Sequence, residues 1–278
     1  MNQNKPIESY GEIARSIRMW ARARSFYNSL AIKYKARNKS ISGSSNWIRF
    51  PFYHYVYRDE QAGFIKQLKY MKNFGDFLSL DSAIEMIASG DKIDGRFFSI
   101  TFDDGVDSCY DYAFPILAAQ NIPAAFFIVP EFMGNGFGKE NRLVRNMPGL
   151  KIKGRYFTWD ECREMIAGGM TMGSHTCNHA KLIQLNDVDA YEQMRRSKDI
   201  IENRLAGYEC KHFTCPWGRP GIDFQDGKHN IFAREIGYKS FLTVQRGAMA
   251  QGDSPFFVKR DFFNAHEDVS MLKYRFGV

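Results

Sequence analysis

The chain of 278 residues lacks several features that would assign it to a class at once. No apolar run is long enough to span a bilayer, and residues 1–6 lack the basic-then-apolar pattern of a secretory signal. No recognisable nucleic-acid-binding module is present either. These absences predict a cytoplasmic protein that does not bind nucleic acid, with peripheral attachment to the inner face of the membrane as the alternative location.

Cysteine is scarce and unpatterned. The five cysteines are an odd number and form no Cys-x-x-Cys pair. This argues against a disulfide framework and fits a reducing compartment.

The chain is rich enough in hydrophobic residues, at 44%, to bury a large core, and its net charge is +7. Much of the excess charge lies in residues 9–39, where a helix-prone basic segment (9–37) precedes a polar linker (38–46). We therefore divide the chain into a basic helical extension with its linker, residues 1–46, and a folded domain, residues 47–278. The extension could pack on the domain, contact anionic lipid or dock a partner.

Strand-like and helical patterns alternate through the folded domain. Strands are predicted at 48–53, 97–102, 124–129, 170–174, 210–215, 241–244 and 256–262, and helices at 59–73, 81–88, 110–120, 158–167, 187–205 and 228–235. This alternation predicts an α/β fold with a mostly parallel sheet, closed or nearly closed into a barrel. Functional residues are then expected at the carboxyl ends of the strands.

Two adjacent carboxylates follow one of these strands. Asp103 and Asp104 lie in the run Thr-Phe-Asp-Asp-Gly, and Gly105 allows the chain to bend so that the two side chains diverge. One carboxylate could bind a metal while the other moves protons. The alternative is a simple turn in which one Asp caps the following helix.

A second polar motif follows another strand. His175 and His179 lie four residues apart, which places both imidazoles on one face of a helical turn. Two imidazoles and one carboxylate form a three-ligand site with open positions, which is typical of catalytic zinc. The same set serves non-haem iron oxygenases, but the strand–helix alternation argues against that class.

These motifs resemble the polysaccharide deacetylase family, also called the NodB homology family or carbohydrate esterase family 4. The similarity covers most of residues 48–265 and is carried by Phe52-Tyr53-His54, the Asp-Asp motif, the His175–His179 segment and Phe213-Thr-Cys-Pro-Trp-Gly218. The resemblance implies an irregular (β/α)7-type barrel. It also implies one divalent metal ion, most often zinc, with cobalt or nickel as alternatives.

The resemblance also implies residue roles. Asp103 is the expected general base, and Asp104, His175 and His179 are the expected metal ligands. The backbone N–H of Trp217, after Pro216, is the expected oxyanion donor, and the Trp217 indole could form an apolar wall.

Three positions depart from the family pattern or match it loosely. Many members carry an arginine two residues before the proline, where Thr214 stands here, and Arg260 is the candidate replacement that orients Asp103. His266, in Asn264-Ala-His266, is the candidate general acid although the usual leucine is missing. His54 could line the pocket.

The leading prediction is therefore a metal-dependent hydrolase that removes N-acetyl or O-acetyl groups from an acetylated sugar in surface polysaccharide biosynthesis. One alternative is a C–N hydrolase acting on a small non-sugar amide, since fold does not fix substrate. Another is a catalytically silent glycan-binding homologue.

Overall fold

The computed structural model describes residues 9–11, 27, 30–134 and 155–278. Most of the predicted basic helix therefore lies outside the described residues. The division between an extension and a barrel domain at residues 46 and 47 stays a prediction.

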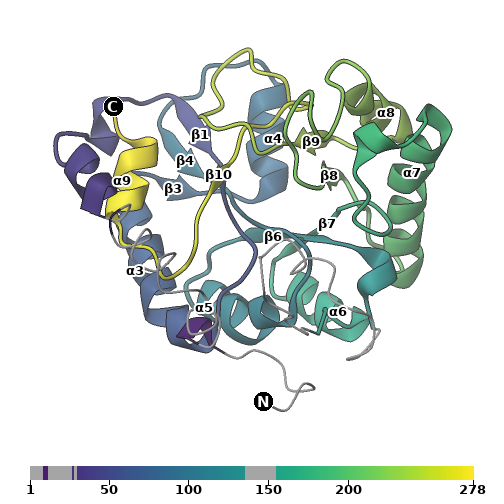
Figure 1. Cartoon of the computed structure of the whole chain (residues 1–278), viewed down its shortest axis with the longest axis horizontal. Helices are drawn as coiled ribbons and strands as arrows, with labels where there is room; N and C mark the ends of the chain where they lie inside the picture. The colour runs from purple at the N-terminus through teal and green to yellow at the C-terminus, as the bar shows by residue number, and fades with distance from the viewer. Residues whose placement is uncertain (1–8, 12–26, 28–29, 135–154) are drawn as a thin grey trace.

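A seven-stranded, all-parallel sheet forms the centre of the molecule (Figure 1). Its spatial order is β10-β2-β5-β6-β7-β8-β9. The strands are β2 (Pro51–Tyr53), β5 (Ile100–Phe102), β6 (Ala124–Ile128), β7 (Thr171–Ser174), β8 (His212–Thr214), β9 (Ser240–Leu242) and β10 (Asp261–Phe262). β2, β5, β6, β8 and β9 are buried along their whole length, as expected for a parallel sheet covered on both faces.

The segment from Val258 to Phe263 joins the two edges of this sheet. Thr243 donates its backbone N–H to the Val258 carbonyl on the β9 side, and Phe263 donates to the Phe52 carbonyl on the β2 side, both at 2.9 Å. The sheet thus curls into an irregular barrel, and the predicted fold class is confirmed.

A smaller parallel sheet contains the two segments that directly precede the barrel strands β2 and β5. It has the order β1-β4-β3, with β1 (Trp47–Arg49), β4 (Arg96–Phe98) and β3 (Asp76–Phe77). The predicted strands 48–53 and 97–102 are each interrupted, at Phe50 and Ser99, so that the chain passes from the small sheet into the barrel.

Helices surround the sheets in Figure 1. They are α3 (Gln61–Lys72), α4 (Leu80–Ala88), α5 (Phe114–Ala119) after a π-helical turn at Cys109–Ala113, α6 (Trp159–Ala167), α7 (Asp187–Arg204), α8 (His229–Ile236) and α9 (Ser270–Phe276). Side-chain caps fix several starts: Thr158 and Glu161 form a capping box on α6, and Asn186 accepts a bond from Asp189 on α7. Helix α9 and strand β3 were not predicted from the sequence.

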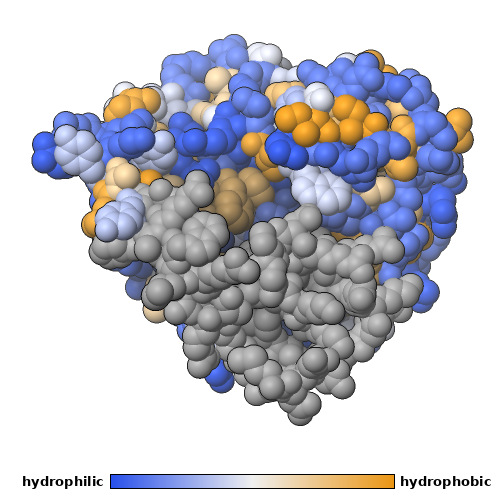
Figure 2. Space-filling model, viewed as in Figure 1, coloured by the Kyte–Doolittle hydropathy of each residue, from blue (hydrophilic) through white to orange (hydrophobic). Residues whose placement is uncertain are grey.

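The residues before β1 pack against the end of the chain. Lys39 Nζ donates to the Gly277 carbonyl at 2.9 Å, and Ser40 and Val278 exchange backbone hydrogen bonds of 3.1 Å. The coloured part of the face in Figure 2 is mostly hydrophilic, with hydrophobic side chains gathered in a few areas. Among the described helices, none combines the length and apolarity that a bilayer crossing needs.

Candidate metal and catalytic site

The Asp-Asp motif lies where β5 ends. Asp103 donates its backbone N–H to the Tyr53 carbonyl at 3.0 Å, which keeps it in the sheet, while Asp104 (φ +78°) and Gly105 (φ +73°) turn the chain sharply. A Cβ atom at position 105 would lie 3.0 Å from Ile128 Cγ2, so both the backbone conformation and the tight space favour glycine. The bend that the sequence predicted at Gly105 is therefore present.

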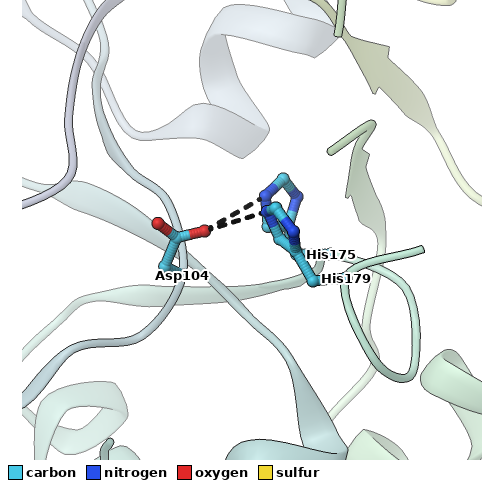
Figure 3. Close-up of side chains that lie close together, drawn as sticks. All are labelled: Asp104, His175 and His179. Carbon is cyan, nitrogen blue, oxygen red and sulfur yellow. Dashed lines mark ion pairs between the residues drawn. The ribbon is translucent and has the colours of Figure 1, made fainter. Parts of the chain in front are cut away.

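Asp104, His175 and His179 converge on one point (Figure 3). Asp104 Oδ1 lies 3.4 Å from Nε2 of His175 and 3.4 Å from Nε2 of His179. This oxygen is buried and has no hydrogen-bond partner. Two ligands each roughly 2.1 Å from a tetrahedral ion lie about 3.4 Å apart, so both distances from Asp104 fit a zinc-like cation.

The tautomer of His175 follows from its second contact. Its Nδ1 lies 2.7 Å from the Thr214 carbonyl, which can only accept, so Nδ1 carries the proton and Nε2 presents its lone pair to the site. The Thr214 backbone thus orients a ligand from the neighbouring strand.

Asp103 is held by Arg260. The guanidinium makes a bidentate bond to the Asp103 carboxylate, with Nη1 to Oδ1 and Nη2 to Oδ2 both at 2.8 Å. Both side chains are buried. Arg260 is therefore the cation beside Asp103, in place of the arginine that the resemblance leads us to expect at position 214.

The electrostatic consequence is an ionised Asp103. Burial by itself raises the pKa of this carboxyl, but the charge and hydrogen bonds of Arg260 lower it by a larger amount, so the pKa lies below its usual value. Burial also raises the pKa of Asp104, but the adjacent imidazoles of His175 and His179 lower it by more, so this pKa lies well below its usual value. Both carboxylates are thus charged at neutral pH.

Trp217 and His54 border the site. The Trp217 ring meets the His179 ring edge-to-face at 4.4 Å, and its side chain is 38% exposed, so it can contact a ligand. The preceding Pro216 accepts a backbone bond from Gly218 at 2.7 Å. His54 Nε2 lies 3.9 Å from Asp104 Oδ2, the oxygen that faces away from the two ligand histidines.

His266 contacts a different set of residues. Its Nδ1 lies 2.5 Å from Oε1 of the buried Glu60, and its ring stacks on Tyr10 at 3.8 Å. Tyr10 and Gly11 in turn donate their backbone N–H groups to Asp59 at 2.6 and 2.9 Å. The predicted role of His266 as general acid stays a prediction.

Sequence reasoning missed the contacts that brace the Asp-Asp turn. Asp107 donates its backbone N–H to Arg155 and Phe157 donates to Gly105, both at 2.9 Å, while Arg155 bonds Glu161 at 2.7 Å. Burial raises the pKa of Asp107 to about 6. In the two backbone contacts, Asp107 with Arg155 and Gly105 with Phe157, the partners are about fifty residues apart in the sequence, so no local pattern signals them.

The Asp103–Arg260 pair gives a prediction about stability. Arg260→Met should lower the free energy of unfolding at pH 7 by about 3–5 kcal/mol, because a buried carboxylate loses its partner. Since Arg260 lowers the pKa of Asp103, the stabilisation is present above the ordinary Asp pKa and is lost as pH falls through the lowered value.

Urea unfolding at neutral and acid pH, at equal metal loading, would measure both effects. The double variant Asp103→Asn, Arg260→Met should recover much of the loss. An equal loss in the single and double variants at pH 7 would contradict a coupled pair.

Comparisons with known proteins identify the family of the chain. The family model "Polysaccharide deacetylase" matches residues 91–240. The chain is 24% identical over 161 residues to YxkH of Bacillus subtilis (strain 168), a match that spans 58% of this chain and 49% of YxkH, about half of that relative.

Solved structures share the fold. IcaB from Ammonifex degensii aligns with a TM-score of 0.69 at 22% identity, over 83% of this chain and 97% of IcaB. The deacetylase PplD from Streptococcus pyogenes, solved in complex with acetate, aligns with a TM-score of 0.64 at 20% identity, over 84% of this chain and 98% of PplD. The family model covers more than half of the chain, which therefore belongs to the polysaccharide deacetylase family.

Proposed function

We propose that the protein is a metal-dependent hydrolase that removes N-acetyl or O-acetyl groups from an acetylated sugar during surface polysaccharide biosynthesis. The observation that carries this proposal is the pairing of a buried, ionised Asp103 with the Asp104–His175–His179 cluster at one end of the barrel. Family membership and the acetate in the PplD structure support acetyl transfer to water as the reaction.

Asp104, His175 and His179 would hold the cation, and His and carboxylate ligands suit Zn²⁺, Co²⁺ or Ni²⁺. When bound, such an ion polarises a carbonyl and lowers the pKa of water. Zinc is the ion that we propose, because three protein ligands with an open position are typical of its catalytic sites.

The chain's own residues supply the proton transfers. Asp103 is charged, lies next to the ligand Asp104 and is fixed by Arg260, so it can accept the proton of the attacking water. The Trp217 backbone N–H, on a residue held at φ +57°, is the proposed donor to the oxyanion. The exposed Trp217 indole would then pack against the acetyl methyl group or the sugar ring.

His54 and His266 are the two candidates for the acid that protonates the leaving amine. His54 borders the cluster at 3.9 Å from Asp104, whereas the Nδ1 atom of His266 is bonded to Glu60. These contacts favour His54.

The roles of the two aspartates can be separated by experiment. Asp103→Asn should lower acetate release from acetylated amino sugars by about 10²–10⁴-fold, because proton transfer is lost, while metal content stays near that of the wild type. The double variant Asp104→Ala, His175→Ala should lose metal and activity together.

Metal content by mass spectrometry and acetate release would be read on the same samples. Near-native turnover by Asp103→Asn would refute its role as base. Activity confined to small amides would favour the alternative C–N hydrolase, and a metal-free, inactive wild type that binds glycans would favour the silent homologue.

The choice between the two histidines gives a third prediction. His54→Ala should lower kcat about 10²-fold and remove the limb of the pH profile that reports the acid, because the nearer imidazole is gone. His266→Ala should keep most of kcat and mainly lower the midpoint of thermal unfolding. The reverse pattern, a collapse of kcat in His266→Ala alone, would assign the acid to His266.

We also propose that the basic N-terminal segment contacts anionic lipid and so holds the enzyme, in the cytoplasm, at the inner face of the membrane. Residues 13–46 contain eight basic and no acidic residues, and without them the chain has 30 basic against 31 acidic residues. Within this segment, Tyr27, Leu30 and Tyr34 are 70%, 47% and 74% exposed. Aromatic and basic side chains exposed together are typical of helices that bind membrane surfaces.

Vesicle flotation would test this contact. Lys33→Glu, Lys35→Glu, Arg37→Glu should abolish binding to vesicles containing anionic lipid, because like charges then repel. A control with the same charge change at exposed Lys69, Lys92 and Lys239 should bind normally. Equal binding by both triple variants, or wild-type binding to neutral vesicles alone, would contradict the proposal.

A further inference from the structure

We propose that Asp223 is a positioning residue that locks the loop carrying His179 to the loop carrying Trp217, and so sets the affinity of the site for its metal. The inference rests on the proposed metal site and adds a residue to which neither the motifs nor the comparisons assign a role. Asp223 lies in the loop that follows β8, six residues after Trp217.

The Asp223 side chain is fully buried and joins both loops. Its Oδ2 accepts the backbone N–H of Arg219 at 3.0 Å and the Arg219 Nε at 2.8 Å, within the Trp217 loop. Its Oδ1 lies 2.9 Å from Nζ of Lys181, two residues after the ligand His179. One carboxylate therefore joins the segment that follows His179 to the segment that follows Trp217.

The backbone repeats the connection. Ile183 donates its N–H to the Asp223 carbonyl at 3.0 Å, and Asp223 donates to the Arg219 carbonyl at 2.9 Å. Asp223 thus bonds to each loop through its main chain as well as its side chain.

Both loops hold conformations that need such support. His179 has φ +61° and Trp217 has φ +57°, in the left-handed region that residues with a Cβ rarely adopt. Their rings are 4.4 Å apart. If the loops separated, the His179 imidazole would lose both its neighbour and its place opposite Asp104.

The charges are consistent with a fixed bridge. Burial raises the pKa of Asp223, but hydrogen bonds from Arg219 and Lys181 lower it by a larger amount, so the pKa lies below its usual value. The carboxylate is therefore ionised while fully enclosed, and two cations on different segments are drawn to it.

The test measures metal affinity and does not depend on turnover. Apo protein would be titrated with Co²⁺ or Zn²⁺ against a chromophoric chelator. Asp223→Asn keeps the shape and can still accept the Arg219 N–H, but it loses the charge that holds Lys181. We expect it to weaken metal binding about 10–100-fold, the range found when residues that orient metal ligands are mutated, with a cooperative unfolding transition retained.

Asp253→Asn is the matched control. Asp253 also accepts a backbone N–H, from Ala250 at 2.9 Å, and bonds a lysine, Lys259, at 3.1 Å. Asp253 lies in the loop after β9, outside the two bridged segments, so the Asp253→Asn variant should bind metal as tightly as the wild type. An Asp223→Asn protein that folds and binds metal within twofold of the wild type would overturn the proposal.

A second variant guards against misfolding of the first. Lys181→Gln alters only the partly exposed end of the bridge and should weaken metal binding several-fold. Unchanged affinity would equally overturn the proposal. Wild-type protein that binds metal but releases no acetate would refute the proposed function alone, since the affinity differences among the variants do not depend on it.

Discussion

The interior of the barrel is organised around the guanidinium of Arg260. Besides its bidentate bond to Asp103, Arg260 donates from Nε to the Thr243 carbonyl at 2.9 Å and from Nη1 to Thr101 Oγ1 at 3.2 Å. It also lies over the ring of Phe52 at 4.4 Å. A fully buried cation is tolerated only when its charge and donors are matched, and here the partners come from β2, β5 and the residue after β9. The same bonds close the barrel and keep the base ionised.

Strain collects where the metal cluster is built. Of the six non-glycine residues with positive φ in the described part of the chain, four belong to the site: Asp104, Thr176, His179 and Trp217. Each costs of the order of 1–3 kcal/mol and persists only where neighbouring contacts hold it. The Thr176 hydroxyl accepts the Ala180 N–H at 3.0 Å, for example, which ties the ends of the His179 turn together. Contacts within the loops therefore hold the ligand geometry.

Local patterns in the sequence predicted the elements that obey local rules. The alternation of strands and helices gave a parallel barrel, and the rule that functional residues follow strands located Asp103, Asp104 and His175 correctly at strand ends. Long-range partners carry no such signal. The contacts of Arg155 with Asp107 and of Asp223 with Lys181 depend on how separate loops meet. The break at Phe50 depends on a second, smaller sheet in which β1 pairs with β4. Helix α9 is only seven residues long, too short for a clear period.

The absence of arginine at position 214 and the presence of Arg260 have one physical explanation. Asp103 can neutralise one buried guanidinium, and a second one beside it would be a buried cation without a partner. Thr214 instead leaves its Oγ1 buried without a hydrogen bond and contributes its carbonyl to His175. Because neighbouring strands of a small barrel all reach the same interior, the cation that Asp103 needs can come from either segment. The chemistry fixes the charge beside the base, and the fold leaves open which element supplies it.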